Sequence, residues 1–449
     1  MNTTQVLVVG GGPTGLWLAC ELRRCGVDAI VLDRRSAGVG ESRAGGLHAR
    51  SLEILRSRGV DGPFLAEGRR VPAAHFAGLW LDMSRLSTEF PYVLGLVQSR
   101  IEALLAEHLR ELGPDVRWNT EVTGVSQTAD HAEVTTADGE RLRADYVVAG
   151  DGGRSTVRRL LGIAFEGTDA TVSSMLADVV LADPPAGPIF QQRTPLGDFS
   201  VLQLQPGCHR LMTNHYEPAT DRGAPLDLGE FREAFVAMAG TDFGLHSPQW
   251  TSRYHDAARL AARYRDGRVL LAGDAAHIHW PAGGQGLNTG LQDATDLGWK
   301  LALTLRGHST TLLDTYEAER RPVAERVLAN TRAQTALCRP GPHVDALRAT
   351  TADLLTIPAV NDRLAAMVAG LDQGERAPDV PLTDGRGALV GAGDVPDGWA
   401  DRVDALPGER ALLVRPDGYV AWSGGPGRTD ALATWFGQPA PSRSALSRA

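Results

Sequence analysis

Lysine, cysteine and long apolar runs are all scarce in this sequence of 449 residues. Lys300 is the only lysine among 45 basic side chains, which we attribute to genomic codon bias rather than to function. No run of about 18 apolar residues occurs, so the sequence predicts no transmembrane helix. The cysteines fit neither a disulfide framework nor a metal site, because only four occur and they are scattered: Cys20, Cys25, Cys208 and Cys338.

Positive charge is also in deficit, since the formal net charge is -9. Nucleic acid is therefore not an expected partner, because phosphate binding requires a basic face. The N-terminal residues, MNTTQVLVVGGG, enter an apolar strand with no basic segment and no cleavage site, so we expect a cytoplasmic protein without a membrane partner. The length exceeds that of one hydrophobic core and predicts two or three domains.

The first 33 residues carry the pattern of a dinucleotide site. A strand at 6–9, a glycine turn at 10–15, a helix and a second strand at 29–32 follow one another. In this order Gly10 makes the turn, Gly12 lets backbone approach a pyrophosphate and Gly15 lets helix and strand pack closely. Asp33, with Arg34 beside it, ends the second strand, where a carboxylate accepts hydrogen bonds from a ribose. The alternative is an ordinary βαβ unit with a glycine turn.

Two later strands also end in a glycine–aspartate pair. The strand at 146–149 precedes Asp151, and the apolar residues RVLLA precede Asp274. Both strand ends are expected to converge on one cofactor, with Asp274 near the hydroxyls of a ribityl chain. The glycine-rich loop 281–288 then feeds a helix, which allows a large ligand to come close to the backbone.

With these motifs the chain resembles the class A FAD-dependent monooxygenases of the p-hydroxybenzoate hydroxylase type, and among them the aromatic polyketide hydroxylases and rifampicin monooxygenases. The resemblance rests on VVGGGPTGL, GESRAGGLHARSLEIL, VQSRIEALLAEH, DGGRSTVR and LAGDAAHIHWPAGGQGLNTGLQDATDLGWKLA. One departure is Asp33, where many relatives carry Glu. The FAD contacts that the resemblance implies fall on Gly12, Pro13, Thr14, Gly15, Asp33, Arg43, Gln98, Asp274, Pro281, Gly286, Leu287 and Asn288.

The resemblance implies that NADPH reduces bound FAD and that O2 then supplies a hydroxyl group to an electron-rich ring of a polycyclic aromatic substrate. NADPH is expected to bind without a Rossmann unit of its own, because only one glycine fingerprint begins a strand–turn–helix. Arg43, in GESRAGG, is the single catalytic candidate, as a cation beside the flavin that helps to bind NADPH or the reduced ring. Its alternative role is that of a salt-bridged surface residue.

The predicted fold class is α/β. An FAD-binding domain covers 1–170 and 266–340, and a mostly antiparallel sheet at 171–265, helped by 71–100, forms the substrate domain. A helical connector at 341–373 leads to a short thioredoxin-like part at 374–449, which lacks a Cys-x-x-Cys pair for redox work. Phe199, Leu202 and Met212 are candidates for the substrate pocket, with plain core as the alternative.

Several alternatives remain open at this stage. His277 and His279 share one face, but no further ligands accompany them, and no metal is expected. Besides the biosynthetic hydroxylase, the sequence allows an antibiotic-inactivating monooxygenase of the rifampicin type. It also allows a non-catalytic flavin protein that sequesters an antibiotic. The protein is expected to be a monomer or a homodimer.

Overall fold

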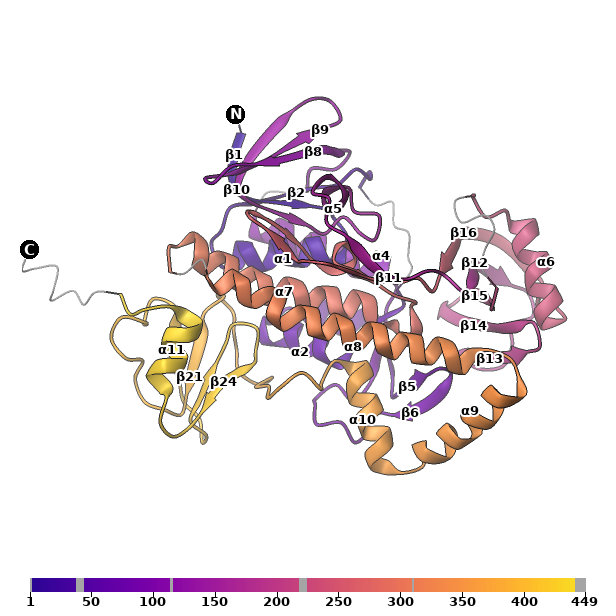
Figure 1. The fold of residues 1–449 in the computed structure, drawn as a ribbon. Coiled ribbons are helices and arrows are strands. Elements are labelled where there is room, and N and C mark those ends of the chain that lie inside the picture. The colour runs from indigo at the N-terminus through magenta and orange to yellow at the C-terminus, as the bar shows by residue number, and fades with distance from the viewer. Residues whose placement is uncertain (1, 38–43, 114–115, 218–223, 309–310, 441–449) are drawn as a thin grey trace, which may run out of the picture.

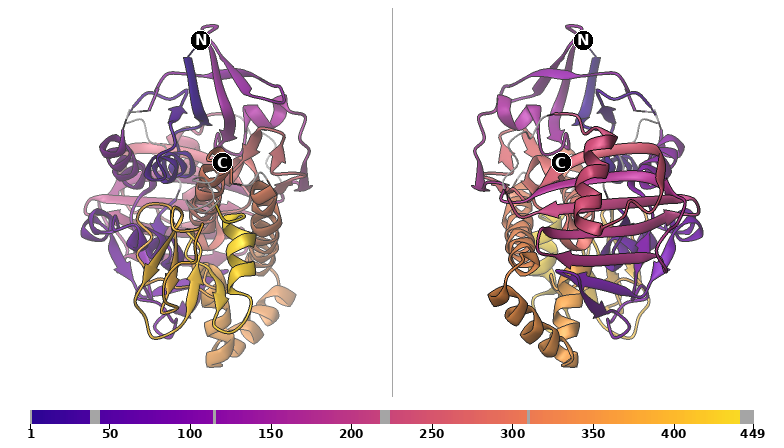
Figure 2. Two further views of the ribbon diagram at one scale, coloured as in Figure 1. Left: turned by 90° about the vertical axis from the view of Figure 1, so that its left-hand side faces the viewer. Right: turned by 90° about the vertical axis from the view of Figure 1, so that its right-hand side faces the viewer.

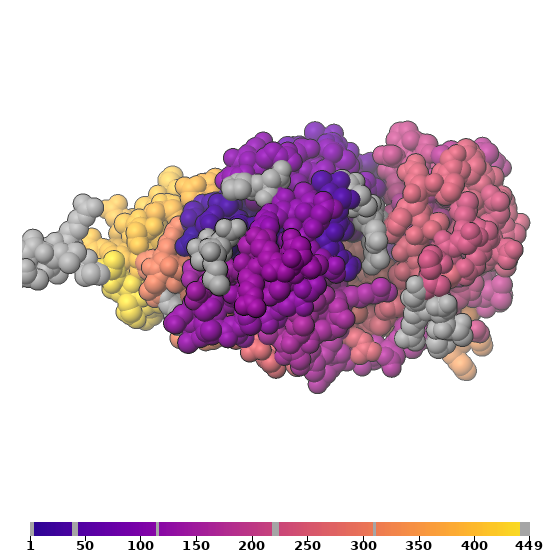
Figure 3. All heavy atoms as spheres, turned by 90° about the horizontal axis from the view of Figure 1, so that it is seen from above, coloured from indigo at the N-terminus to yellow at the C-terminus, as the bar shows by residue number. Residues whose placement is uncertain are grey.

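The computed structural model describes residues 2–37, 44–113, 116–217, 224–308 and 311–440. Its central part is a sheet with covering helices, and two smaller units lie at opposite ends of this part (Figure 1). One end holds an antiparallel sheet and the other holds the C-terminal unit, as the space-filling view also shows (Figure 3). Among the described helices, none is both long and apolar enough to cross a bilayer.

The central sheet runs in the order β18-β19-β10-β1-β2. Four of these strands are parallel neighbours: β1 (Asn2–Val9), β2 (Ala29–Leu32), β10 (Arg141–Ala149) and β19 (Val269–Leu271). Antiparallel additions are β8 (Val122–Gln127), β9 (Ala132–Thr136) and β18 (Arg265–Asp266). Val9 pairs with both Leu32 and Ala149, and Ala149 pairs with Leu271. The carboxyl ends of all four parallel strands therefore lie along one edge.

Long helices pack against this sheet and against each other. They are α1 (Pro13–Arg24), α4 (Gln98–Leu112), α7 (Gln285–Leu305) and α8 (Asp314–Cys338). Trp17 Nε1 in α1 donates to Thr295 Oγ1 in α7 at 2.8 Å, so a buried hydrogen bond joins the two helices. Helix α8 runs beside α7 and reaches toward the antiparallel sheet (Figure 1).

Short elements connect these layers. Three small sheets contain β3 (Gly46–Leu47), β4 (Arg69–Val71) and β7 (Val93–Gly95); β5 (Ala73–Phe76) and β6 (Leu79–Asp82); and β11 (Phe165–Thr168), β17 (Ala258–Ala261) and β20 (His277–Ile278). Further α-helices are α2 (Ala49–Ser57), α3 (Gly62–Glu67), α5 (Thr156–Leu160), α9 (Pro342–Leu355) and α10 (Pro358–Ala369). Three 3-10 turns are η1 (Gly273–Ala275), η2 (Ala282–Gly284) and η3 (Thr311–Leu313).

The antiparallel sheet has one face against a helix and the other toward the central part. Its order is β13-β14-β15-β12-β16, and helix α6 (Leu228–Ala239) covers the outer face (Figure 2). The strands are β12 (Ser173–Leu181), β13 (Ile189–Thr194), β14 (Gly197–Gln205), β15 (Cys208–His215) and β16 (Leu245–His255). Phe231 and Phe235 of α6 pack on Val201 and Leu211 of the sheet. This core belongs to the outer face alone.

The C-terminal unit is a small mixed sheet in the order β22-β21-β23-β24 with one helix. Its elements are β21 (Gly387–Val390), β22 (Val403–Leu406), β23 (Leu412–Val414), β24 (Val420–Ser423) and α11 (Arg428–Phe436). Phe436 packs against Trp299 of α7 in a shared core. The unit therefore sits on the helix whose first turn belongs to the glycine-rich loop.

Candidate functional site

The three glycines of the first turn do different work. Gly10 has φ +108°, and a Cβ there would lie 2.4 Å from the carbonyl oxygen of Gly150. A Cβ on Gly15 would lie 1.9 Å from the carbonyl oxygen of Gly10, so these two positions permit close packing of β1, β10 and α1. Gly12 forms the N-cap of α1, and nothing lies within 4 Å of its Cβ position in the described part of the chain. Only Gly12 thus leaves open space in front of the helix.

Pro13 and Thr14 form the first turn of α1. Proline has no backbone N–H, and the N–H of the first helical residue has no partner inside the helix, so Pro13 suits this position. The Thr14 hydroxyl lies 2.6 Å from the Cβ position of Gly273 and 2.3 Å from that of Gly290. Thr14 therefore packs where the turn after β19 and helix α7 come together, which joins the first and third motifs.

Asp33 lies at the end of β2 and is buried. Its Oδ2 accepts a hydrogen bond from Gly11 N at 2.6 Å, and its Oδ1 accepts one from Arg35 N at 2.7 Å. The predicted neighbour, Arg34, is exposed. Arg35 instead turns toward the site, where its guanidinium also contacts the Gly11 carbonyl oxygen and Glu102. Sequence reasoning missed Arg35, although the doubled arginine after Asp33 offered the choice.

Gln98 begins helix α4 and ties it to the segment before β3. Its Oε1 accepts a hydrogen bond from Ala44 N at 3.1 Å, and its Nε2 donates to Glu102 at 2.8 Å. Burial raises the pKa of Glu102, although Gln98 and Arg35 act against this shift. Arg43, the catalytic candidate, lies outside the described residues.

Asp151 follows β10 and reaches the start of α5. Its Oδ2 accepts hydrogen bonds from Thr156 N at 2.7 Å and Val157 N at 3.2 Å. Its Oδ1 is buried and meets no hydrogen-bond partner within the described ranges. Burial raises the pKa of this carboxyl group. Nearby, Arg158 donates to the Ala275 carbonyl oxygen at 2.8 Å, which links the second motif to the third.

The turn after β19 and the glycine-rich loop carry the remaining predicted residues. Asp274, in η1, and Pro281 are exposed, whereas Gly286 and Leu287 are half-buried in the first turn of α7. Gly284 is the N-cap of α7 in the left-handed region, with φ +66° and no side-chain cap. The first amides of α7 have no partner inside the helix. They present the positive end of a 21-residue helix to this edge.

The side chain of Asn288 is fully engaged inside the protein. Its Oδ1 accepts hydrogen bonds from His48 N at 2.8 Å and Ser51 Oγ at 2.7 Å. Its Nδ2 donates to the carbonyl oxygens of Gly46 at 3.2 Å and Gly284 at 3.0 Å. Asn288 therefore fixes the loop against β3 and α2, and its side chain is already occupied by protein partners.

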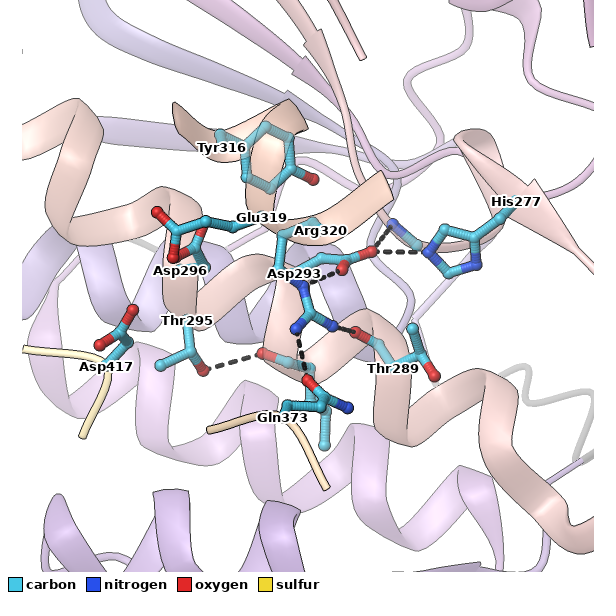
Figure 4. Close-up of polar contacts among 12 residues, drawn as sticks. His277, Thr289, Asp293, Thr295, Asp296, Tyr316, Glu319, Arg320, Gln373 and Asp417 are labelled. Atoms are coloured by element: carbon cyan, nitrogen blue, oxygen red, sulfur yellow. Dashed lines mark hydrogen bonds and ion pairs between the residues drawn. The ribbon is translucent and has the colours of Figure 1, made fainter. Parts of the chain in front are cut away.

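A buried chain of charged groups supports the turn after β19 (Figure 4). Asp293 Oδ2 accepts hydrogen bonds from His277 Nε2 at 2.7 Å and Gly273 N at 3.1 Å, and its Oδ1 accepts one from Arg320 Nε at 2.7 Å. Burial raises the pKa of Asp293, but the charges of Arg320 and His277 outweigh this effect and hold it below its ordinary value. Arg320 also donates to Gln373 at 2.9 Å. The sequence analysis considered His277 only as a metal ligand and missed this chain.

The three predicted pocket residues of the antiparallel sheet do not share one surface. Successive strand residues point to opposite faces, so Phe199 and Leu202 in β14 face opposite ways. Phe199 packs against Phe235 of α6, with ring centroids 5.5 Å apart, and belongs to the outer core. This corrects the prediction for Phe199. Met212, opposite Ser200 in the sheet, shares the inner face with Leu202, and both are half-buried.

The residues at the edge fit a flavin dinucleotide. Open space lies before Gly12, the strand beside β1 ends at Asp151 with a carboxylate oxygen that has no partner in the described structure, and α7 begins without a side-chain cap. The order Asp33, Gly12, Asp151 and Asp274 follows the strand order β2, β1, β10 and β19 along one edge. A ligand with two ends and a central pyrophosphate has this extended shape.

Comparison with protein families decides the class. A model of the FAD binding domain matches residues 3–331. A second model, for the C-terminal part of aromatic-ring hydroxylases, matches residues 244–439. The chain belongs to the FAD-dependent aromatic-ring hydroxylases.

Relatives of this hydroxylase extend over nearly its whole length. A 12-dehydrotetracycline 5-monooxygenase/anhydrotetracycline 6-monooxygenase from Streptomyces rimosus is 42% identical, over 97% of this chain and 99% of that protein. A rifampicin monooxygenase from Streptomyces venezuelae is 43% identical, over 96% of this chain and 98% of that protein. The solved structure of an anhydrotetracycline hydroxylase from Streptomyces rimosus matches with a TM-score of 0.91 and 41% identity, over 98% of this chain and all of that one (100%).

Proposed function

We propose that this hydroxylase uses NADPH and O2 to add a hydroxyl group to a polycyclic aromatic molecule, in particular an aromatic polyketide. The observation that carries the proposal is that β2, β1, β10 and β19 end along one edge of the central sheet, where Thr14 of α1 packs against Gly290 of α7. The tetracycline-type relatives support the class of substrate. When bound, FAD supplies the electron transfer from NADPH and the reaction with O2.

Each part of the edge has a role in this proposal. The start of α1 at Gly12 and Pro13 holds the pyrophosphate, and Asp33 holds the adenosine ribose. Asp274 holds the ribityl chain, and the start of α7, at Gly286 and Leu287, lies against the flavin ring. The helix dipole favours negative charge there by about 0.5–2 kcal/mol. Gly10 and Gly15 act through packing, and Arg43 remains the proposed cation for NADPH or the reduced ring.

The inner face of the antiparallel sheet forms the other wall in this proposal. Leu202 and Met212 offer apolar contacts to a polycyclic substrate. On the same face, Asp198 Oδ1 accepts a hydrogen bond from Asn214 Nδ2 at 2.7 Å and Asp198 Oδ2 accepts one from Tyr216 OH at 2.5 Å. Burial raises the pKa of Asp198. The domains proposed for this arrangement are 1–170 with 266–340, 171–265 with 71–100, 341–373 and 374–449.

The test is a screen of NADPH consumption with purified protein and a panel of polycyclic phenols, followed by product mass. Consumption that rises with one compound, together with a product heavier by one oxygen atom, supports the proposal. Consumption that stays at its basal rate, with no oxygenated product from any tetracycline-type phenol, contradicts it. Light scattering measures whether the protein is a monomer or a homodimer, and cell fractionation tests the proposed cytoplasmic location.

Inactivation of an antibiotic is a second candidate, which the rifampicin monooxygenase relative supports. The same assay separates the two, because an inactivating enzyme consumes NADPH with an antibiotic and leaves a product without antibacterial activity. A protein that only sequesters the antibiotic binds it without consuming NADPH.

A further inference from the structure

His279 lies one residue after β20, directly before Trp280 and the glycine-rich loop, and its ring is held in one protonation form. Its Nδ1 lies 2.7 Å from the carbonyl oxygen of Trp280. Since a carbonyl oxygen only accepts hydrogen bonds, Nδ1 carries the proton, and Nε2 of the neutral ring is an acceptor. Burial lowers the pKa of His279, with a smaller contribution from His277. The neutral form therefore predominates near pH 7.

The acceptor atom of His279 is buried, and no donor reaches it from the described parts of the chain. It lies 3.6 Å from the point that a Cβ on Gly286 would occupy. Asp274 Oδ1 lies 3.9 Å from the same point. Two hydrogen-bond acceptors thus flank one spot on the first turn of α7, where glycine leaves room. A buried acceptor without a donor is unfavourable, so the pair is suited to a ligand that brings donors.

The chemistry of the pair selects the part of FAD that can lie there. Phosphate oxygens and ring carbonyls only accept, so they are unsuited to a site with two acceptors. The flavin N3–H donates but lies between two ring carbonyls, and the adenine amino group is a single donor group at the other end of FAD. Neighbouring hydroxyl groups can donate to two neighbouring acceptors, and FAD carries them on its two sugar-derived parts. Asp33 follows β2 and Asp274 follows β19, and these strands are three spacings apart in the sheet, about 14 Å. With the adenosine ribose at Asp33, the hydroxyls at Asp274 belong to the ribityl chain.

We propose that His279 Nε2 accepts a hydrogen bond from a ribityl hydroxyl of FAD, beside Asp274. This proposal rests on the placement of FAD in the proposed function, and it adds a cofactor contact that lies outside the glycine and aspartate motifs. Trp280 is then a positioning residue, because its carbonyl oxygen sets which nitrogen of His279 accepts.

The test is an FAD titration of the apoprotein, followed by the change in flavin fluorescence without NADPH or substrate. His279→Leu should weaken FAD binding about 3- to 10-fold, the equivalent of one hydrogen bond. His343→Leu is the matched control, because His343 is exposed on α9. It should bind FAD as the wild type does. Equal affinity in His279→Leu and the wild type would overturn the proposal.

FAD analogues that lack one ribityl hydroxyl distinguish a direct contact from a general loosening of the loop. At least one of 2′-, 3′- and 4′-deoxy-FAD should bind the wild type several-fold more weakly than FAD does. That penalty should be absent in His279→Leu, since the partner of the missing hydroxyl is already gone. Identical penalties in both proteins for all three analogues would show that His279 does not contact the ribityl chain.

A spectroscopic measurement covers the case in which the leucine variant does not fold. In protein labelled with 15N-histidine, the resonance of the unprotonated Nε2 of His279 should shift on addition of FAD, and His279→Gln identifies it. An unchanged resonance with FAD bound refutes the contact. These measurements need no turnover, so a negative result for His279 would not contradict the proposed hydroxylase activity. Conversely, an absence of substrate-stimulated NADPH consumption would not contradict the proposed contact between His279 and FAD.

Discussion

Asp293→Asn tests whether the buried charged chain stabilises the turn that carries Asp274. The carboxylate of Asp293 is fully buried and accepts from three donors, on His277, Gly273 and Arg320. An asparagine keeps one acceptor oxygen and places an NH2 group against a second donor. Arg320 then remains buried without its counter-charge. Removing one partner of a buried ion pair costs about 3–5 kcal/mol, so we expect the free energy of unfolding to fall by this amount.

The assay is urea unfolding followed by circular dichroism, in parallel with FAD titration. Glu67→Gln is the control, because Glu67 pairs with Arg100 at 2.6 Å but both side chains are about 40% exposed. Loss of such a surface pair costs about 0–1 kcal/mol. FAD binding should weaken in Asp293→Asn and stay unchanged in the control, since Asp293 holds Gly273 N next to Asp274. A loss of stability in Asp293→Asn no larger than in Glu67→Gln would refute this reasoning.

The pH dependence gives a second check on Asp293. Its folded pKa is lowered, so its stabilising contribution is fully present above the unfolded pKa of about 3.9 and is lost as pH falls through the folded value. The difference between wild type and Asp293→Asn should therefore shrink only in strong acid. A difference that already shrinks between pH 7 and about pH 5, above the unfolded pKa, would contradict a lowered pKa for Asp293. The double variant Asp293→Asn/Arg320→Gln should lose less than the sum of its single variants.

Three further predictions follow from packing. Gly12→Ala should weaken FAD binding about tenfold and leave the free energy of unfolding nearly unchanged. Gly15→Ala should lower the free energy of unfolding, measured in urea, by about 1–3 kcal/mol, because its Cβ would lie 1.9 Å from a carbonyl oxygen. The reverse pattern would contradict the roles assigned to the two glycines. Phe199→Ala should lower the free energy of unfolding by about 3–5 kcal/mol, and Leu202→Ala should mainly raise the KM for the aromatic substrate. If KM changed in Phe199→Ala and not in Leu202→Ala, the pocket would lie on the outer face of the sheet and not on the inner one. Lys300→Arg should lower the free energy of unfolding by about 1–3 kcal/mol although the charge is the same. If the variant unfolded at the same urea concentration as the wild type, the site would accept either cation.

The strand ends of the site were predictable because their signals are local. An apolar strand followed by glycine and aspartate identifies a carboxyl end, and parallel pairing then brings Asp33, Asp151 and Asp274 to one edge. The period of two along a strand also contained the answer for Phe199 and Leu202, which lie three positions apart and so face opposite ways. The candidates were chosen for their apolar side chains alone, without asking which face of the strand each one occupies, and Phe199 belongs to the core, the alternative that the sequence also allowed.

The buried ionic contacts could not be predicted from the sequence, because they join residues that are far apart in the chain. Asp293 is separated from His277 by 16 positions and from Arg320 by 27. Nothing in the spacing shows that all three are buried on facing elements. The choice of Arg35 over Arg34 depends on where β2 ends, to within one residue. Such contacts follow from tertiary packing, which determines which charged side chains are buried and desolvated.

Lys300, the only lysine of the sequence, lies in a buried cluster of charged side chains. An arginine-rich sequence keeps one lysine, and that side chain is fully buried between Asp296 and Glu319, at 2.9 and 2.8 Å from its Nζ. Arg415 of the C-terminal unit reaches the same Glu319 at 2.6 Å. A compact ammonium group fits between two carboxylates, whereas a planar guanidinium there would crowd Arg415. We therefore expect this junction of α7, α8 and the C-terminal unit to accept lysine more readily than arginine, which Lys300→Arg tests.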